Sequence, residues 1–137
     1  MTRIDFYQIN PGGLDTGRVV CSLCQKAWDA GQKVLLLTAD EQQSEEYDQL
    51  LWTWRDDSFL PHDREEPEGM LTPILVTHEA DPRGERQCLI NLSREIPVWF
   101  AQFDRVLEIV DEDNKALARK HYAFYKERGY ELNHIRL

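Results

Sequence analysis

The sequence lacks the features that mark membrane-spanning, secreted and disulfide-stabilised proteins. No apolar run approaches the roughly 20 residues that a transmembrane helix requires, and the first residues do not resemble a secretory signal. The three cysteines, Cys21, Cys24 and Cys88, are too few and odd in number for a disulfide framework, and they suit a reducing compartment. We therefore expect a cytoplasmic protein without membrane contact, whose cysteines are buried thiols.

Positive charge is also scarce. The chain has 16 Lys or Arg residues against 25 Asp or Glu, a formal net charge of −9. This balance argues against broad contact with nucleic-acid phosphates, because such binding depends on cations that displace counterions. The distribution is uneven, since residues 115–137 hold six basic and two acidic residues whereas the first 114 hold ten and 23. The basic character is concentrated in one terminal segment.

Phosphate-binding motifs are incomplete or missing. The segment GGLDTGRV (12–19) has the glycine spacing of a P-loop. However, Arg18 replaces the lysine that would reach the phosphates, and Val19 replaces the Ser or Thr that would hold Mg²⁺. No GxGxxG follows the first expected strand, which removes the dinucleotide interpretation. An ordinary glycine turn is the preferred interpretation of 12–19, with a nucleotide site as the alternative.

Local metal and catalytic constellations are missing as well. Cys21 and Cys24 form a CxxC pair, but no second pair supplies the remaining ligands of a structural zinc. Cys24 also falls on the apolar side of an expected helix, with Val20 and Trp28, as a core residue would. The histidines form no HxxxH or Ser-His-Asp arrangement with their neighbours in sequence. We expect no catalytic residues, no metal and no cofactor.

The apolar residues that are present predict alternating strands and helices. Hydrophobic residues make up 42% of the 137 positions, enough for the core of one domain, 1–137. Periodicity and turn residues predict strands at 3–9, 33–40, 73–78, 87–92, 103–110 and 130–137, helices at 15–30, 40–54 and 113–128, and a loop at 55–72. Asp40 is the expected N-cap of the second helix, and Gly129 the expected stop of the third. This alternation predicts an α/β fold: a single domain with a mainly parallel, Rossmann-like sheet and helices on both faces.

The last helix carries a stripe of cations around a tyrosine. At about 100° per residue, Lys115, Arg119, Tyr122 and Lys126 fall within roughly 60° of one another. We call these four residues the stripe. A solvated basic face is the alternative interpretation, because Lys and Arg also favour the end of a helix.

Residues around the stripe favour a binding role. Leu117 and Phe124 point away from it and are expected to face the core, with Ala118 and Tyr125 between. Val110, at the end of the preceding strand, lies close to the helix start. Cations beside an apolar shelf suit a short acidic peptide that ends in a hydrophobic residue, since Arg can grip carboxylates bidentately. A single nucleic-acid strand is the rival ligand, and the acidity of the remaining chain weighs against it.

The sequence resembles the chi family of accessory subunits of the bacterial DNA polymerase III holoenzyme. The resemblance is spread over the order and spacing of the segments FYQI (6–9), WDAGQKVLLLTADEQQSEEYDQLLW (28–52), SFLPH (58–62), PILVT (73–77), FDRVLEIVD (103–111) and ALARKHYAFYKERGYEL (116–132). A compact acidic loop at 63–71 departs from the family pattern and puts contacts made by that loop in doubt.

The resemblance implies a non-enzymatic subunit of the clamp-loader assembly in DNA replication. Its implied partners are the small psi subunit and the acidic C-terminal tail of single-stranded DNA-binding protein, with little direct nucleic-acid binding. The implied tail site is Val110, Lys115, Arg119 and Tyr122. Trp52 and Phe59 are the implied psi-facing residues, with the alternative that both are core residues at a helix end. A Rossmann-like protein that binds a nucleotide or single-stranded nucleic acid is the alternative function.

Overall fold

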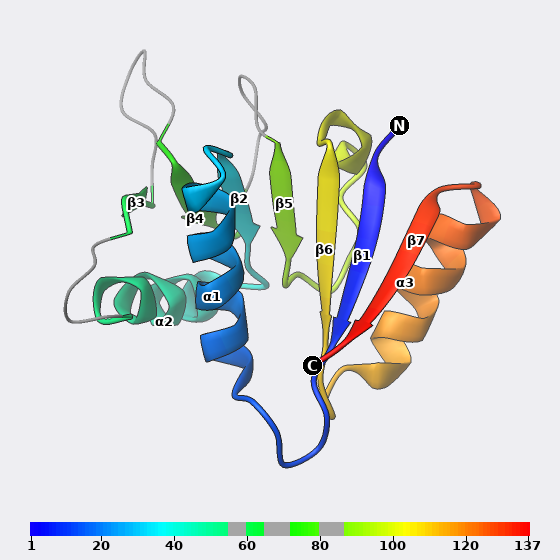
Figure 1. Cartoon of the computed structure of the whole chain (residues 1–137), viewed down its shortest axis with the longest axis horizontal. Helices are drawn as coiled ribbons and strands as arrows, with labels where there is room; N and C mark the ends of the chain where they lie inside the picture. The colour runs from blue at the N-terminus through cyan, green and yellow to red at the C-terminus, as the bar shows by residue number, and fades with distance from the viewer. Residues whose placement is uncertain (55–59, 65–71, 80–86) are drawn as a thin grey trace.

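The computed structural model describes residues 1–54, 60–64, 72–79 and 87–137. The strands are β1 (Arg3–Gln8), β2 (Val34–Leu37), β3 (His62–Asp63), β4 (Ile74–Thr77), β5 (Cys88–Asn91), β6 (Arg105–Val110) and β7 (Glu131–Arg136). The helices are α1 (Thr16–Asp29), α2 (Glu41–Trp52), α3 (Lys115–Glu127) and the short 3₁₀ helix η1 (Phe100–Gln102). Helices and strands alternate in the described residues except at β3, β4 and β5, which follow one another without a described helix between them (Figure 1). Every strand and helix expected from the apolar pattern is present, with ends that differ by a few residues.

One sheet joins the described strands in the order β3-β4-β2-β5-β6-β1-β7. Each pairing is parallel, so the predicted mainly parallel sheet is confirmed. Parallel neighbours need crossover connections, which explains why α1, α2 and α3 lie between strands in the sequence. The last crossover runs from β6 through α3 to β7 and passes β1 (Figure 1). It brings α3 to one end of the sheet.

Helices cover both faces of the sheet, as predicted for a Rossmann-like α/β fold. On one face, buried residues of α1 and α2 pack in a cluster with Val34 and Leu36 of β2. On the other face, α3 and η1 share a cluster with Leu35 and Leu37. The four residues of β2 are all buried because they serve both layers in alternation.

The helix ends follow the predicted local chemistry. The side chain of Asp40 accepts a hydrogen bond from the backbone N–H of Gln43 at 2.8 Å, as an N-cap residue does. Gly129 follows α3 with a φ of 79°, a left-handed conformation that favours glycine. The backbone N–H of Gly129 donates to the carbonyl oxygen of Lys126 at 3.0 Å and closes the last turn. Both predicted boundaries are confirmed.

Two features were not expected from the sequence. Residues His62 and Asp63, expected in a loop, pair with Ile74 and Leu75 as the two-residue edge strand β3. Such a short strand has no alternating apolar pattern to reveal it. The segment before β6, for which the sequence predicted neither a helix nor a strand, contains the 3₁₀ turn η1.

The cysteines are buried, and the described helices are short. Cys21, Cys24 and Cys88 are buried free thiols, as predicted. Burial raises the pKa of Cys21 to about 11, so this thiol stays protonated at neutral pH. In the described part of the chain no helix is both long enough and apolar enough to span a bilayer.

Candidate functional site

The start of α3 is fixed to the end of β6 by a network of side-chain to backbone bonds. The amide nitrogen of Asn114 donates to the carbonyl oxygen of Ile109 at 2.7 Å, and its amide oxygen accepts from the backbone N–H of Asp111 at 2.9 Å. The carboxylate of Asp111 in turn accepts from the backbone N–H of Asn114 at 3.2 Å. Val110 and Lys115 are therefore held in a set relation at the two ends of this turn.

The stripe occupies one side of α3, beside its buried face. Arg119 and Lys126 are exposed, Lys115 is half-buried, and the Tyr122 side chain remains 38% exposed. Val110 is 9% exposed and belongs to the cluster beneath α3. The three cations and the ring thus lie along one accessible surface.

An apolar shelf lies under the ring of Tyr122. The ring meets the buried Phe6 of β1 edge to face, with centroids 5.3 Å apart and planes at 62°. Phe6 and Val110 lie in the same buried cluster. Aromatic pairs of this geometry add roughly 0.5–1.5 kcal/mol beyond area burial. Tyr122 is therefore a positioned ring with one open face, which sequence reasoning could not supply because the contact with Phe6 joins distant segments.

The buried face of α3 differs from the expected one. Ala118, His121 and Tyr125 are buried, whereas Leu117 and Phe124, expected to face the core, are half-buried. Phe124 still packs against the core cluster on this face, so the expectation fails for Leu117, which is not part of that cluster. His121 is buried instead because it shares the buried partner Glu108 with Tyr125, which hydrophobicity alone does not reveal.

A buried carboxylate, Glu108 of β6, holds this face of α3. It is 5% exposed and accepts hydrogen bonds from the hydroxyl of Tyr125 at 2.8 Å and the amide nitrogen of Asn91 at 2.9 Å. Nδ1 of His121 lies 2.9 Å from its other oxygen. Burial acts to lower the pKa of His121, but the hydrogen bond and charge of Glu108 outweigh it and raise the pKa. Burial, with the charge of Glu108, also raises the pKa of Tyr125.

The Glu108 network was missed by sequence reasoning. Its signal was present, since Glu108 is an acid inside the otherwise apolar strand segment VLEIV (106–110). Buried acids need hydrogen-bond donors, and the polar residues of the following helix were the available donors. The network positions α3 on the sheet, and with it the stripe.

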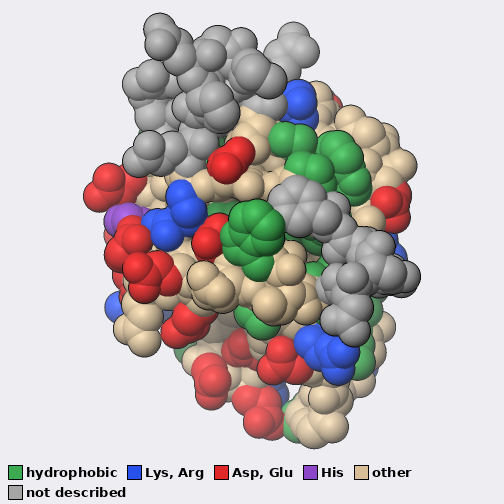
Figure 2. All heavy atoms as spheres, turned by 90° about the vertical axis from the view of Figure 1, so that its left-hand side faces the viewer, with side chains coloured by type: hydrophobic (Ala, Val, Ile, Leu, Met, Phe, Trp, Pro, Cys, Tyr) green, Lys and Arg blue, Asp and Glu red, His purple; other side chains and the backbone are tan. Residues whose placement is uncertain are grey.

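The second predicted surface lies at the end of α2. Trp52 is 55% exposed, and its ring meets that of His62 edge to face at 5.2 Å. The core interpretation is therefore wrong for Trp52. Phe59, its predicted companion, lies outside the described residues. On the side of the molecule that carries α2 and β3, hydrophobic side chains gather near the middle, with acidic side chains around them (Figure 2).

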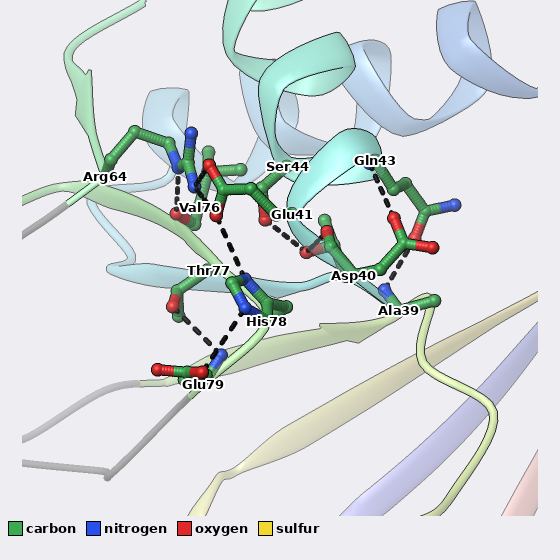
Figure 3. A network of polar contacts seen from close by, with 11 residues as sticks. Ala39, Asp40, Glu41, Gln43, Ser44, Arg64, Val76, Thr77, His78 and Glu79 are labelled. Atoms are coloured by element: carbon green, nitrogen blue, oxygen red, sulfur yellow. Dashed lines mark hydrogen bonds and ion pairs between the residues drawn. The ribbon is translucent and has the colours of Figure 1, made fainter.

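An ion-pair cluster fastens α2 to the neighbouring edge of the sheet. Arg64 and His78 approach the carboxylate of Glu41, the first residue of α2, from different directions (Figure 3). Both Glu41 oxygens accept from the Arg64 guanidinium at 2.8 Å, and Nδ1 of His78 lies 3.4 Å away. The hydrogen bond with Arg64 lowers the pKa of Glu41. This cluster holds the helix that carries Trp52.

Comparison with known proteins identifies the family. The family description "DNA polymerase III chi subunit, HolC" matches residues 1–133. The chain belongs to this family. DNA polymerase III subunit chi of Pseudomonas aeruginosa is 40% identical over the whole chain and 98% of its own length. The chi subunits of Haemophilus influenzae and Escherichia coli strain K12 are 31% and 29% identical, over 88% and 85% of this chain and 86% and 82% of their own lengths.

The near P-loop of this chi-family chain is a packed helix start. Thr16, Arg18 and Val19 lie in α1, and the Asp15 carboxylate accepts from the backbone N–H of Arg18 at 3.2 Å. The Asp15 carboxylate therefore already binds a backbone N–H at the helix start that a bound phosphate would need. A Cβ at Gly17 would stand 3.0 Å from Cδ1 of Leu50, so this glycine serves the close packing of α1 on α2. The geometry disfavours the nucleotide alternative.

A polar cavity of about 710 Å³ lies at the carboxyl ends of β2, β5 and β6, the edge where open α/β sheets commonly bind ligands. Its lining includes the acidic residues Asp40, Glu46, Glu108, Asp111 and Asp113, and the basic residues Arg94, Lys120 and His121. This excess of acids disfavours a phosphate ligand. No three potential His, Cys, Asp or Glu metal ligands gather anywhere in the described residues.

Proposed function

We propose that this chi-family chain is a non-catalytic accessory subunit of the DNA polymerase III clamp-loader assembly in DNA replication. It binds the psi subunit and the acidic C-terminal tail of single-stranded DNA-binding protein, and so connects the polymerase to protein-coated single-stranded DNA. The stripe on α3, with the half-exposed ring of Tyr122 seated on Phe6, is the observation that supports the tail site.

The chemistry of the stripe fits an acidic peptide with an apolar end. Arg119 offers a planar set of donors that pairs with a carboxylate in two parallel hydrogen bonds. Lys115 adds a second positive charge at the start of the helix. The partial negative charge of the helix C-terminus, which would repel a carboxylate, lies at the other end. The ring of Tyr122 and the edge of Val110 give the apolar end of the peptide a surface to cover. One binding site thus combines charge recognition with hydrophobic burial.

The exposed ring of Trp52 supports the proposed psi-facing surface. Large aromatic side chains are enriched among the residues that carry binding energy at protein interfaces. Trp52 lies on α2, which packs on the opposite face of the sheet from α3. The two proposed sites therefore use different helices and different faces of the sheet.

The test of the tail site is a calorimetric titration with the C-terminal peptide of a bacterial single-stranded DNA-binding protein. Arg119→Ala should weaken binding by about 1.5–3 kcal/mol, the range for a hydrogen bond to a charged group. Lys26→Ala is the matched control, because it removes one exposed cation from α1 on the opposite face. Equal affinities of the wild type and Arg119→Ala would refute the assignment.

Single-stranded nucleic acid is the competing ligand, favoured by the same combination of cations and an aromatic ring. A bare oligonucleotide at physiological salt distinguishes the two. The proposal expects weak binding or none, since the remaining chain is strongly acidic. Oligonucleotide binding comparable to that of the tail peptide, and weakened by Arg119→Ala, would favour the nucleic-acid function instead.

A further inference from the structure

The flank of α3 that bears the stripe is the flank nearest β7. His121 reaches Glu108 of β6 and lies 3.3 Å from the carbonyl oxygen of Arg94, which follows β5. Tyr122, on the other flank, reaches Phe6 of β1. The sheet order is β5-β6-β1-β7 at this end. Since Tyr122 belongs to the stripe, the stripe lies on the side of α3 that faces β1 and, beyond it, β7.

The register of the sheet brings Arg136 into a row with the apolar shelf. Gln8 of β1 pairs with Val110 of β6 on one side and with Arg136 of β7 on the other. Paired residues of parallel strands point to the same face of the sheet, and Val110 faces the α3 side. Arg136 is exposed on that face. A cation of β7 thus stands one strand beyond the shelf that the stripe borders.

The end of β7 is anchored around Arg136. The backbone N–H of Leu137 donates to the carbonyl oxygen of Gln8 at 3.0 Å, and the amide of Asn10 donates to the carbonyl oxygen of Leu137 at 2.8 Å. Nε2 of His134 donates to the side-chain oxygen of Gln8 at 2.7 Å. The two bonds of Leu137 fix the backbone next to Arg136, so binding through its side chain does not require the end of β7 to become ordered.

The acidic residues that precede α3 also favour a carboxylate site near β7. The exposed acids Glu112 and Asp113 precede α3 and partly offset the attraction that Lys115 exerts on a carboxylate at the start of the helix. A peptide with several acids is favoured where cations lie on both sides of it, between Arg119 and Arg136. Acidic residues of such a peptide would therefore be favoured between the stripe and β7.

We propose that Arg136 is a second carboxylate-binding residue of the acidic-peptide site, so that the peptide crosses the end of β1 between α3 and β7. This inference rests on the proposed function and adds a residue from an element that the sequence interpretation did not assign to the site. Arg119 and Arg136 bind different carboxylates of the same peptide. The tail is recognised by a row of charges as well as by its apolar end.

The test extends the titration to peptides in which each acidic residue is replaced, one at a time, by its amide. Arg136→Ala should weaken binding of the unmodified peptide about two- to five-fold, as expected for one exposed ion pair, and Arg136→Glu should weaken it further. In Arg136→Ala, replacing one particular acid of the peptide should no longer lower the affinity, because its partner is gone. In Arg119→Ala, the acid whose replacement has no effect on affinity should be a different one. Lys26→Ala should leave every affinity unchanged.

The outcomes separate this inference from the function on which it rests. If the wild type binds and Arg119→Ala weakens binding, but both Arg136 variants bind like Lys26→Ala, the second carboxylate site is refuted while the tail site stands. If Arg119 and Arg136 couple to the same acid, the proposed course of the peptide across β1 is refuted. If the wild type does not bind the peptide, the proposed function fails and the inference fails with it.

Discussion

At the scale of single residues, Tyr122 combines a fixed position with an open surface. One side of its ring packs on Phe6, yet 38% of the residue stays exposed. A ring held in this way loses little side-chain freedom when a partner covers it, so more of the burial energy contributes to affinity. The same residue on a mobile loop would bind less tightly with the same contacts.

His121 gives the stability of the chain a pH dependence of defined sign. Its pKa is raised in the folded protein above the ordinary value of about 6.5. Between the unfolded and folded pKa values the folded state holds more protons, so the free energy of unfolding falls as the pH rises through the raised pKa. Urea unfolding from about pH 6 to about pH 8.5 should show this decline.

The comparison with variants isolates this histidine. His121→Gln should flatten the decline, because its side chain can donate to Glu108 but does not titrate. Lys26→Ala, which removes an exposed lysine and leaves every histidine in place, should keep the wild-type slope. A slope that is the same in the wild type and in His121→Gln would contradict the protonation of His121 as the cause.

At the scale of elements, the position of α3 depends on the bond between Tyr125 and Glu108. Tyr125 is fully buried, and its hydroxyl donates to the carboxylate at 2.8 Å. Tyr125→Phe leaves a buried acid with one donor fewer, which should lower the free energy of unfolding by about 1–3 kcal/mol. Urea denaturation should show a lower midpoint with an unchanged slope.

The matched control for this hydroxyl lies three residues earlier on the same helix. Tyr122→Phe removes a hydroxyl from the half-exposed ring and should change the free energy of unfolding by less than about 0.5 kcal/mol. Equal effects of the two substitutions would show that the Glu108 network does not hold α3.

Much of the fold was predictable because each helix and long strand carries its own periodic signal. Val34–Leu37 reads as a continuous apolar run since both faces of β2 are covered. β3, with two residues, is too short for any period. Its strand conformation depends on pairing with β4, which is decided by tertiary packing.

The candidate site was predictable along the helix and unpredictable across the sheet. Helical geometry brings Lys115, Arg119 and Tyr122 together without knowledge of the fold. The ring packs on Phe6 of β1, and the proposed second cation lies on β7, which only the strand register relates to β1 and β6. Phe6 and Arg136 therefore could not be assigned from spacing alone.

At the scale of the whole molecule, the proposed partner surfaces use opposite layers. α3 packs on one face of the sheet and α2 on the other (Figure 1). Residues 1–114 carry a strong excess of acids, and residues 115–137 an excess of cations. An acidic tail is thus attracted to α3 and repelled by the remaining surface, which favours one orientation of binding.

This separation predicts that the two partners can be lost independently. In a pull-down with purified psi and single-stranded DNA-binding protein, Arg119→Ala should lose the single-stranded DNA-binding protein and retain psi, whereas Trp52→Ala should do the reverse. Each variant serves as the folding control of the other, because a misfolded chain would lose both partners. Distant sites without shared contacts have nearly additive effects, so the double variant should lose each partner to the same degree as the corresponding single variant. Loss of psi in Arg119→Ala, with a circular dichroism spectrum like that of the wild type, would mean that the two partners share one surface.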